Sequence, residues 1–275
     1  MNYGFVKVGA YTPAVVVADC MTNAKEIIKK IEEADKDRVQ LVVFPELSIT
    51  GYTCGDLFLQ DVLLENAKGA LVEITKNTIG KEMVVVVGMP LVYNNNIYNV
   101  ACVLCNGEIL GIVPKSYIPN YSEFYEKRHF TGGRDMQGVV SICEEYDNIP
   151  FACDLVFTCS SFKDFRIGVE ICEDLWAVNP PSSNLALAGT TVIVNPSASN
   201  EITGKDVYRK NLVSMQSARC ICGYVYADAG LNESTTDLVF AGHNIITENG
   251  TVIKESDRFT NGNAKAYIDI GKLVS

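Results

Sequence analysis

The spacing of apolar residues changes several times along the first third of the chain. Weak alternation, helical spacing after Asn23 and a continuous apolar run ending at Phe44 predict, in turn, a strand, a capped helix and a strand covered on both faces. A second helix and a third strand follow. This succession is typical of helices packed on a sheet. The expected elements span residues 5–10, 24–34, 41–44, 62–76 and 83–88.

Two hairpins are predicted farther along the chain. Each joins two apolar runs through Asn-Gly, at residues 106–107 and 249–250, and this dipeptide favours a two-residue hairpin turn. Two halves of this kind suggest an internally symmetric sandwich, although two hairpins are weak support for a duplication. Residues 123–162 are irregular and are expected to form loops over the sheet ends. The other expected elements span residues 98–105, 108–114, 192–195, 206–220, 224–227, 242–248 and 251–255.

The segment 165–171 alternates with a period of two and predicts a half-buried strand with Glu170 on its polar face. Cys172 follows directly, and the acidic residues Glu173 and Asp174 suit the first turn of a helix. A cysteine between a strand end and a helix start is held by rigid backbone. Nearby N–H groups are expected to lower its pKa or to bind an oxyanion. A buried structural cysteine is the alternative interpretation.

Composition narrows the class of protein. The chain has 275 residues, of which 48% are hydrophobic, and no Pro/Gly/Ser-rich linker divides it, so a single large α/β domain is expected. A net charge of -10 argues against nucleic acid or an anionic membrane surface as a partner. No apolar run approaches the roughly 18 residues of a membrane span. Ten cysteines without a recognisable secretion signal predict reduced thiols and a cytoplasmic location.

The spacing of the cysteines does not favour a metal site. Cys102 and Cys105 have the spacing of a redox or zinc motif, but they lie on a predicted strand, where residues three apart point to opposite faces. Cys220 and Cys222 can share a face, yet no second pair of ligands lies near them in the sequence. With only two histidines in the chain, a cysteine/histidine zinc site is not expected.

Two charged residues are placed to assist a cysteine nucleophile. Glu46 follows a buried strand and Pro45, and Lys115 follows another strand and Pro114, so both emerge at strand ends, where parallel-sheet enzymes build their sites. A carboxylate can take the proton of Cys172, and a cation can stabilise the thiolate and an oxyanion. An exposed loop carboxylate and a solvated lysine are the structural alternatives. The joint placement favours a catalytic site.

These residues lie in segments that resemble the three signature regions of the nitrilase, or carbon–nitrogen hydrolase, superfamily: residues 44–47, 114–117 and 170–174. More narrowly, the chain is similar to the amidohydrolase domain of glutamine-dependent NAD synthetases, over nearly its whole length. The segments that carry the narrower similarity are residues 47–58, 115–128, 172–176, 195–199 and 233–238.

The resemblance implies an α/β fold built as a four-layer α-β-β-α sandwich, in one domain over residues 1–275. It implies Glu46 as general base, Lys115 as oxyanion stabiliser and Cys172 as nucleophile. The backbone N–H of Glu173 is expected to be the second oxyanion donor. The other residues that the resemblance places around a bound glutamine are Tyr52, Tyr121, Glu126, Trp176, Ser199 and Lys205.

Elementary charge complementarity suggests how the ends of glutamine are held. A carboxylate such as Glu126 suits the α-ammonium group of the substrate. Lys205 and the Ser199 hydroxyl suit its α-carboxylate. Core packing for Trp176 and an exposed loop position for Lys205 remain open as structural alternatives.

The resemblance also implies a partner. Glutamine is expected to be hydrolysed to glutamate and ammonia without a cofactor, and the ammonia is expected to serve an ATP-dependent synthetase domain. ATP, magnesium and deamido-NAD belong to that domain, whose Ser-Gly-Gly-x-Asp-Ser loop is absent from this chain. The chain is therefore expected to be an excised domain or a stand-alone amidohydrolase, and self-association is expected from the superfamily. The alternatives are a stand-alone amidase or nitrilase acting on another small amide or nitrile, a non-catalytic scaffold, and a metal or disulfide sensor built on the cysteines.

Overall fold

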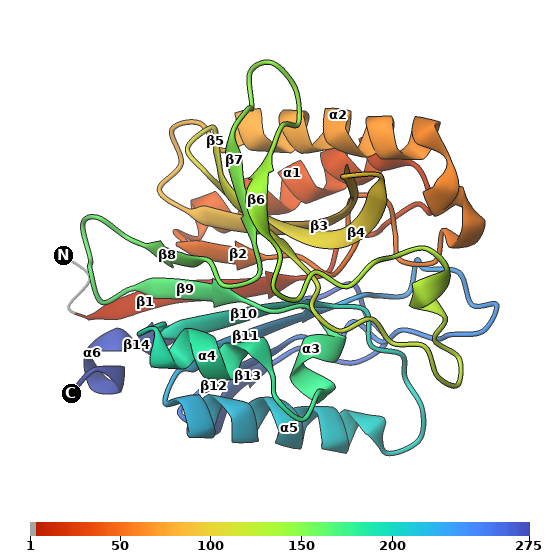
Figure 1. The fold of residues 1–275 in the computed structure, drawn as a ribbon. Helices are drawn as coiled ribbons and strands as arrows, with labels where there is room; N and C mark the ends of the chain where they lie inside the picture. The colour runs from red at the N-terminus through yellow and green to blue at the C-terminus, as the bar shows by residue number, and fades with distance from the viewer. Residues whose placement is uncertain (1–3) are drawn as a thin grey trace.

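The structure, a computed structural model, describes residues 4–275 and places two β-sheets face to face between two layers of helices (Figure 1). The larger sheet has eight strands in the order β14-β1-β2-β3-β4-β5-β7-β6. Strands β1, β2 and β3 run parallel, and β4 and β5 continue as antiparallel neighbours. The bounds are β1 Phe5–Tyr11, β2 Leu41–Val43, β3 Val84–Tyr93, β4 Asn96–Cys105, β5 Glu108–Pro114, β6 Gln137–Val140, β7 Ile149–Ala152 and β14 Asn263–Asp269.

The smaller sheet has six strands in the order β13-β12-β11-β10-β9-β8. Its three central strands, β9, β10 and β11, run parallel, so their carboxyl ends meet at one edge. Strands β8 and β12 pair antiparallel with β9 and β11, and β13 pairs antiparallel with β12. The bounds are β8 Val156–Thr158, β9 Arg166–Val169, β10 Val192–Ser197, β11 Gly223–Asp228, β12 Ile245–Glu248 and β13 Thr251–Glu255.

Helices cover the outer face of each sheet. Helices α1 and α2 lie on the larger sheet, and α3, α4 and α5 lie on the smaller one (Figure 1). The expected four-layer α-β-β-α sandwich is thereby confirmed. The helices span Cys20–Lys36 (α1), Asp61–Asn77 (α2), Glu173–Trp176 (α3), Pro181–Leu187 (α4), Lys205–Cys220 (α5) and Ile270–Leu273 (α6), and two 3-10 turns span Gly55–Leu59 (η1) and Glu126–Arg128 (η2).

The core between the sheets consists mostly of β-branched side chains that are closed to solvent. Val43 and Val86 of the larger sheet and Val169, Val194 and Val225 of the smaller one belong to the same buried cluster. At roughly 25 cal/mol per Å² of apolar surface removed from water, this layer supplies a large part of the driving force that docks the two sheets. The docking matters for function because residues from both sheets meet at one edge.

Helix α1 begins four residues earlier than expected, and its predicted cap is wrong. Asp19 caps the helix, because its carboxylate accepts a hydrogen bond from Thr22 N at 3.0 Å. Asn23 lies inside the first turn and is fully buried. Its side chain accepts from Val16 N and donates to the carbonyl oxygens of Val16 and Ile49, so this asparagine ties the helix to two loops.

Two other expectations need correction. The segment 123–162 is not only loop, because it contains three short strands: β7 and the edge strand β6 of the larger sheet, and the edge strand β8 of the smaller one. The strand β9 is also not half-buried. A Cβ atom on Gly168 would lie 3.1 Å from Leu185 of α4 and from Thr190, so helix α4 covers the face that was expected to be polar. The buried environment of Glu170 follows from the same contact.

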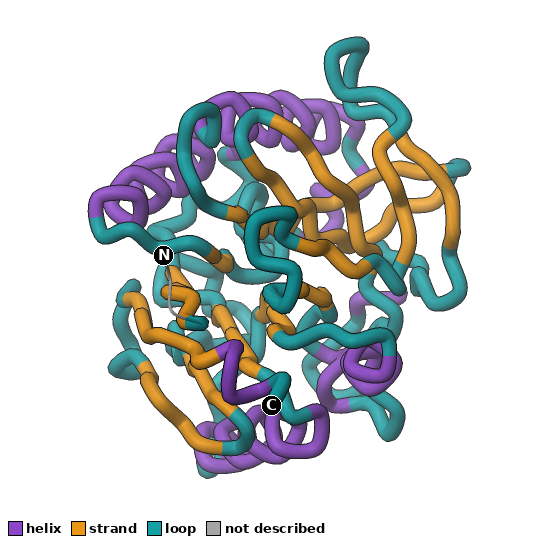
Figure 2. The backbone as a smooth tube through the Cα atoms, turned by 90° about the vertical axis from the view of Figure 1, so that its left-hand side faces the viewer, coloured by secondary structure: helices purple, strands orange, loops and turns teal. Residues whose placement is uncertain are grey.

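The two Asn-Gly hairpins are confirmed. Asn106 and Gly107 have φ angles of 47° and 81°, and Asn249 and Gly250 have 42° and 85°, as a turn with two left-handed residues requires. The last strand, β14, returns to pair antiparallel with β1, which brings the C-terminal helix beside the start of the described chain (Figure 2). Among residues 4–275, no helix combines the length and the apolar composition needed to cross a membrane.

Candidate active site

The structure brings Glu46, Lys115 and Cys172 together at one edge of the two sheets. Glu46 follows β2, Lys115 follows β5 and Cys172 follows β9, each just beyond the carboxyl end of its strand. Lys115 Nζ lies 2.5 Å from Glu46 Oε1, and the charges of both residues act on the pKa of Cys172. The three residues are at most 6% exposed. The acid, the amine and the sulfur therefore share one desolvated site.

Glu46 is held by partners from three segments. Its Oε1 atom accepts hydrogen bonds from Lys115 and, at 2.6 Å, from the side chain of Asn99 in β4. Its Oε2 atom accepts from the backbone N–H of Ala198, just beyond β10 in the other sheet, at 2.9 Å. These contacts fix the rotamer of the carboxylate, and a lone pair of Oε2 remains for a further proton. The anchoring residues Asn99 and Ala198 had not been predicted.

Lys115 lies between two carboxylates. Its Nζ atom is 2.9 Å from both oxygens of Glu126, whose carboxylate also accepts from Tyr52 Oη at 2.8 Å. Burial favours loss of the charge, but Glu126 and Glu46 raise the pKa of Lys115 well above its ordinary value. The lysine is therefore a permanent cation. If Glu46 and Glu126 each accept one of its three N–H groups, the third N–H group remains available to another acceptor.

The backbone of Cys172 is strained. Its φ of 44° and ψ of -99° are rarely adopted by a side chain other than glycine. The strain is held by hydrogen bonds from Cys172 N to Asn195 Oδ1 at 2.8 Å and to Pro196 O at 3.0 Å. This turn starts helix α3, and the peptide N–H of Glu173 at its first position has no acceptor among residues 4–275. A free donor beside the sulfur suits an oxyanion.

The pKa of the Cys172 thiol is raised well above its ordinary value, contrary to the expectation from sequence. Burial is the main cause and the charge of Glu46 adds to it, whereas Lys115 and a hydrogen bond from Ser197 act in the opposite direction. The resting sulfur is therefore a thiol. A nucleophile in this state needs a base at the moment of attack, and Glu46 is the carboxylate in place.

Asp174 ties the segment after Lys115 to the turn of Cys172. Its carboxylate accepts from the backbone N–H groups of Ser116 at 3.0 Å, Tyr117 at 2.8 Å and Ile171 at 2.9 Å. Burial raises the pKa of Asp174 to about 7. From the sequence, this residue was interpreted only as a favourable charge at a helix start, because nothing in the spacing reveals which distant amides it accepts from.

A pocket of ≈ 430 Å³ opens over Cys172. Of the seven further residues that the sequence associates with substrate, six line it with the cysteine: Tyr121, Glu126, Glu173, Trp176, Ser199 and Lys205. Tyr52 does not. It lies behind Glu126 and lines an adjoining pocket of ≈ 220 Å³. The structure thus gathers the predicted set at one place, while the individual roles stay predictions.

The pocket carries charges of both signs. Tyr121 Oη lies 3.0 Å from Glu173 Oε2, and the Lys205 ammonium lies 5.2 Å from the ring centroid of Trp176 and 5.3 Å from that of Phe124. Burial lowers the pKa of Lys205. Both side chains line the same pocket, so Lys205 is not simply an exposed loop residue. Trp176 lines the pocket and also packs against the core cluster of the smaller sheet, so core packing stays part of its role.

Neither histidine of the chain lines this pocket. His129 lies 3.0 Å from Asp56, and His243 lies between Arg209 and Glu255. Within residues 4–275, no group of three or more histidine, cysteine or acidic side chains is arranged to hold a metal ion.

Gly88 of β3 is predicted to be indispensable for the placement of Glu46. A Cβ atom at this position would lie 2.3 Å from Leu47 N and 2.9 Å from the carbonyl carbon of Glu46, so Gly88→Ala must push the strand and the loop apart. We expect a loss of about 1–3 kcal/mol in the free energy of unfolding, measured in urea, and a loss of catalytic activity. The matched control is Gly69→Ala on helix α2, where a Cβ meets nothing within 4 Å and alanine adds helix stability. Equal behaviour of the two variants would contradict the prediction.

Comparison with known proteins places this geometry in a family. The family described as "Carbon-nitrogen hydrolase" matches residues 7–275. The glutamine-dependent NAD(+) synthetase of Mycobacterium tuberculosis (strain CDC 1551 / Oshkosh) is 41% identical over 269 residues, which are 98% of this chain and 39% of that protein. The protein of the same name from Aquifex aeolicus is 28% identical and covers 93% of this chain and 41% of its own length. The chain thus spans about two fifths of these relatives.

Solved structures agree. The crystal structure of a glutamine-dependent NAD(+) synthetase from Cytophaga hutchinsonii superposes with a TM-score of 0.85 at 32% identity, covering 98% of this chain and 43% of that one. An amidase from Nesterenkonia sp. has a TM-score of 0.76 at 17% identity over 98% of this chain and 92% of its own, and shares the fold. With its four-layer sandwich and the match over residues 7–275, the chain belongs to the carbon–nitrogen hydrolase family.

Proposed function

We propose that this chain hydrolyses the side-chain amide of glutamine to glutamate and ammonia through a thioester on Cys172. The observation that carries the proposal is the buried contact of Glu46 and Lys115 beside that thiol, at the floor of a pocket with cationic and acidic side chains. A thiol, a base and a permanent cation are the groups that acyl transfer from an amide requires. A pocket with charges of both signs suits a zwitterionic amino acid.

In the first half of the reaction, Glu46 accepts the thiol proton as the sulfur of Cys172 attacks the amide carbon. The carbonyl oxygen becomes an oxyanion, which Lys115 and the peptide N–H of Glu173 stabilise. Collapse of the intermediate breaks the carbon–nitrogen bond. The leaving nitrogen takes the proton from Glu46 and departs as ammonia, which leaves a thioester and an ionised Glu46.

In the second half of the reaction, a water molecule enters the position beside Glu46 that the ammonia has left. Glu46 takes one proton from the water as its oxygen attacks the thioester carbon, and the oxyanion occupies the same two donors. Collapse breaks the carbon–sulfur bond, and the proton returns from Glu46 to the sulfur. Glutamate leaves, and the thiol of Cys172 is restored. Each half therefore uses Glu46 once as base and once as acid.

At the amino-acid end, Lys205 and the Ser199 hydroxyl are proposed to bind the α-carboxylate. Glu126 was expected to receive the α-ammonium group, but both of its oxygens face Lys115. We therefore propose that Glu173, which Tyr121 orients on the pocket wall, shares this task. Trp176 supplies an aromatic wall beside Lys205.

The ammonia is proposed to serve an ATP-dependent synthetase domain. The supporting observation is that the relatives named glutamine-dependent NAD(+) synthetase extend well beyond the region that this chain matches. ATP, magnesium and deamido-NAD belong to that proposed partner, and the hydrolytic steps above use none of them. Self-association and a cytoplasmic location stay predictions.

The test is ammonia release from glutamine by the purified chain, compared with asparagine, simple aliphatic amides and nitriles. We expect glutamine to be preferred, because the charged groups of the pocket can pair with the ammonium and carboxylate groups of an amino acid. Incubation with a glutamine analogue that carries an electrophile at the γ position should add its mass to Cys172 and leave the exposed Cys143 unmodified. Preference for a neutral amide or nitrile would favour a different amidase, and labelling elsewhere would contradict the proposed nucleophile.

A further inference from the structure

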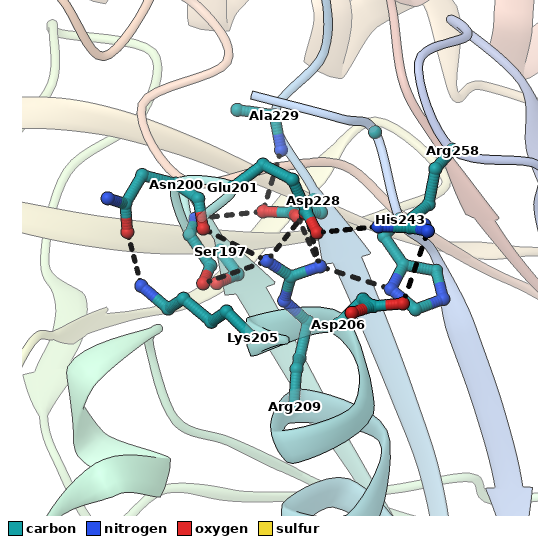
Figure 3. Close-up of polar contacts among 12 residues, drawn as sticks. Ser197, Asn200, Glu201, Lys205, Asp206, Arg209, Asp228, Ala229, His243 and Arg258 are labelled. Atoms are coloured by element: carbon teal, nitrogen blue, oxygen red, sulfur yellow. Dashed lines mark hydrogen bonds and ion pairs between the residues drawn. The ribbon is translucent and has the colours of Figure 1, made fainter. Parts of the chain in front are cut away.

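Arg209 is a fully buried arginine on helix α5, directed toward the ends of β10 and β11 (Figure 3). Its Nη1 and Nη2 atoms each donate to Glu201 Oε2 at 3.0 Å, and Nη1 lies 3.8 Å from Asp228 Oδ2. Nη1 also donates to His243 Nδ1 at 3.0 Å. Removing a guanidinium group from water is costly, and only well-placed partners compensate for it. Arg209 does not line the pocket, so none of the steps above accounts for it.

The contacts of this arginine reach the pocket through Ser199. Asp228 Oδ1 accepts the backbone N–H of Ser199 at 2.8 Å and that of Ala229 at 3.1 Å. From the other side, Arg209 Nη2 lies 3.4 Å from the Ser199 hydroxyl oxygen and donates to the carbonyl oxygen of Asn200 at 3.1 Å. The ion pair of Arg209 and Asp228 therefore holds both the backbone and the side chain of a pocket residue.

A second connection runs through the side chain of Asn200. Its Oδ1 atom accepts a hydrogen bond from Lys205 Nζ, and its Nδ2 atom donates to Glu123 Oε1 at 2.5 Å. Lys205 and Glu123 both line the pocket. Because Arg209 Nη2 donates to the backbone carbonyl oxygen of Asn200, it helps to place the side-chain amide that accepts from the ammonium group of Lys205 (Figure 3).

Lys205 itself makes no ion pair within residues 4–275. Its ammonium group instead lies over the rings of Trp176 and Phe124 and on the neutral amide of Asn200. A partly buried cation without a carboxylate partner suits an anionic group of a ligand, because burial of a charge is compensated only by a partner. The orientation of the Lys205 ammonium group must then come from neutral contacts. Among these contacts, Asn200 is the one that accepts a hydrogen bond from it.

We infer that Arg209 is a positioning residue for recognition of the α-carboxylate: with Asp228 it fixes Ser199 and Asn200, and through Asn200 it directs Lys205 toward the substrate. This inference rests on the proposed glutamine hydrolysis. It assigns specificity for an amino acid to a buried ion pair that touches no substrate. The chemistry at Cys172 is expected to be unaffected, because the contacts of Arg209 do not include Glu46 or Lys115.

The test compares Arg209→Lys and Asn200→Ala on two substrates, L-glutamine and 4-aminobutanamide, which is glutamine without its α-carboxylate. Lysine keeps the charge of Arg209 but loses the fork that reaches Glu201 and Asn200 together. We expect each variant to raise KM for glutamine on the order of tenfold, the loss of a hydrogen bond to a charged group. Values of kcat/KM for 4-aminobutanamide should change less than about twofold.

The matched control is Arg258→Lys. Arg258 pairs with Glu201 Oε1 and with Asp206 on the exposed side, and it is not bonded to Ser199 or Asn200. Arg258→Lys should leave KM for glutamine and kcat/KM for 4-aminobutanamide unchanged. Parallel losses on glutamine and 4-aminobutanamide in Asn200→Ala would overturn the inference, because a general loss of structure moves both. An unchanged KM for glutamine in Arg209→Lys would overturn the inference as well. Should Arg209→Lys fail to fold, Asp228→Asn, which removes the charge that pairs with Arg209, takes its place with the same expected split between the two substrates. Absence of glutamine hydrolysis by the wild-type chain would refute the proposed function itself. Failure of the variants in an active wild-type background would refute only the role of Arg209, so the two results are distinguishable.

Discussion

Replacing Cys172 with alanine is expected to reduce ammonia release from glutamine by about 10⁴-fold or more. The variant keeps the pocket and the contact between Glu46 and Lys115, but it has no atom able to form a covalent intermediate. Water could attack the amide only directly, against a poor leaving group. The measurement is initial-rate ammonia release with enzyme in the micromolar range, beside the wild-type chain.

The control for this change is Cys143→Ala, which removes an exposed thiol and should leave turnover as it is. Glutamine binding provides a second check. Because the pocket is retained, Cys172→Ala should still bind glutamine in calorimetry and should accumulate no acyl adduct in mass spectrometry. Full turnover by this variant would remove the basis of the mechanism.

Replacing Glu46 with glutamine should lower kcat by about 10³-fold, the usual contribution of a well-placed general base. The amide has nearly the same shape, and Lys115 keeps the partner Glu126, so the fold is expected to survive. The physical reason for the loss is the state of the nucleophile. The pKa of Cys172 is raised well above its ordinary value, mainly by burial, so without a base the sulfur stays protonated at neutral pH.

The pH profile separates a missing base from a damaged fold. Below its pKa, the thiolate fraction of a cysteine rises tenfold for each pH unit. Residual activity of Glu46→Gln should therefore climb from about pH 7 toward pH 9, whereas the wild-type enzyme, in which Glu46 is proposed to take the thiol proton, should depend on pH much less. A flat profile of the variant, or one parallel to the wild type, would show that Glu46 does not act as the base.

The strand-end positions of Glu46, Lys115 and Cys172 could be predicted because they depend on local signals. An apolar run, a proline and a charged residue are read directly from neighbouring positions, and parallel strands bring such ends to one edge. The four layers could be predicted by resemblance to a family. These parts of the site are encoded by short stretches of sequence.

The partners of these residues could not be predicted. Asn99 reaches Glu46 from 53 residues away, and the carboxylate of Asp174 accepts from amides 57 and 58 residues away. Such contacts depend on strand register and sheet docking, which periodicity does not specify. The predicted direction of the pKa shift of Cys172 was wrong for a related reason. Local N–H groups and a lysine suggested a lowered value, but burial depends on the whole fold.

The bond from Ala198 to Glu46 has a consequence for how activity arises during folding. The carboxylate comes from one sheet and the amide that orients it from the other, and Asp174 joins segments of the two sheets in the same way. A chain with only one sheet assembled would hold a thiol without its proton acceptor. On the proposed mechanism, the chain is therefore inactive until the two sheets have docked, and turnover reports the completed assembly of the sandwich.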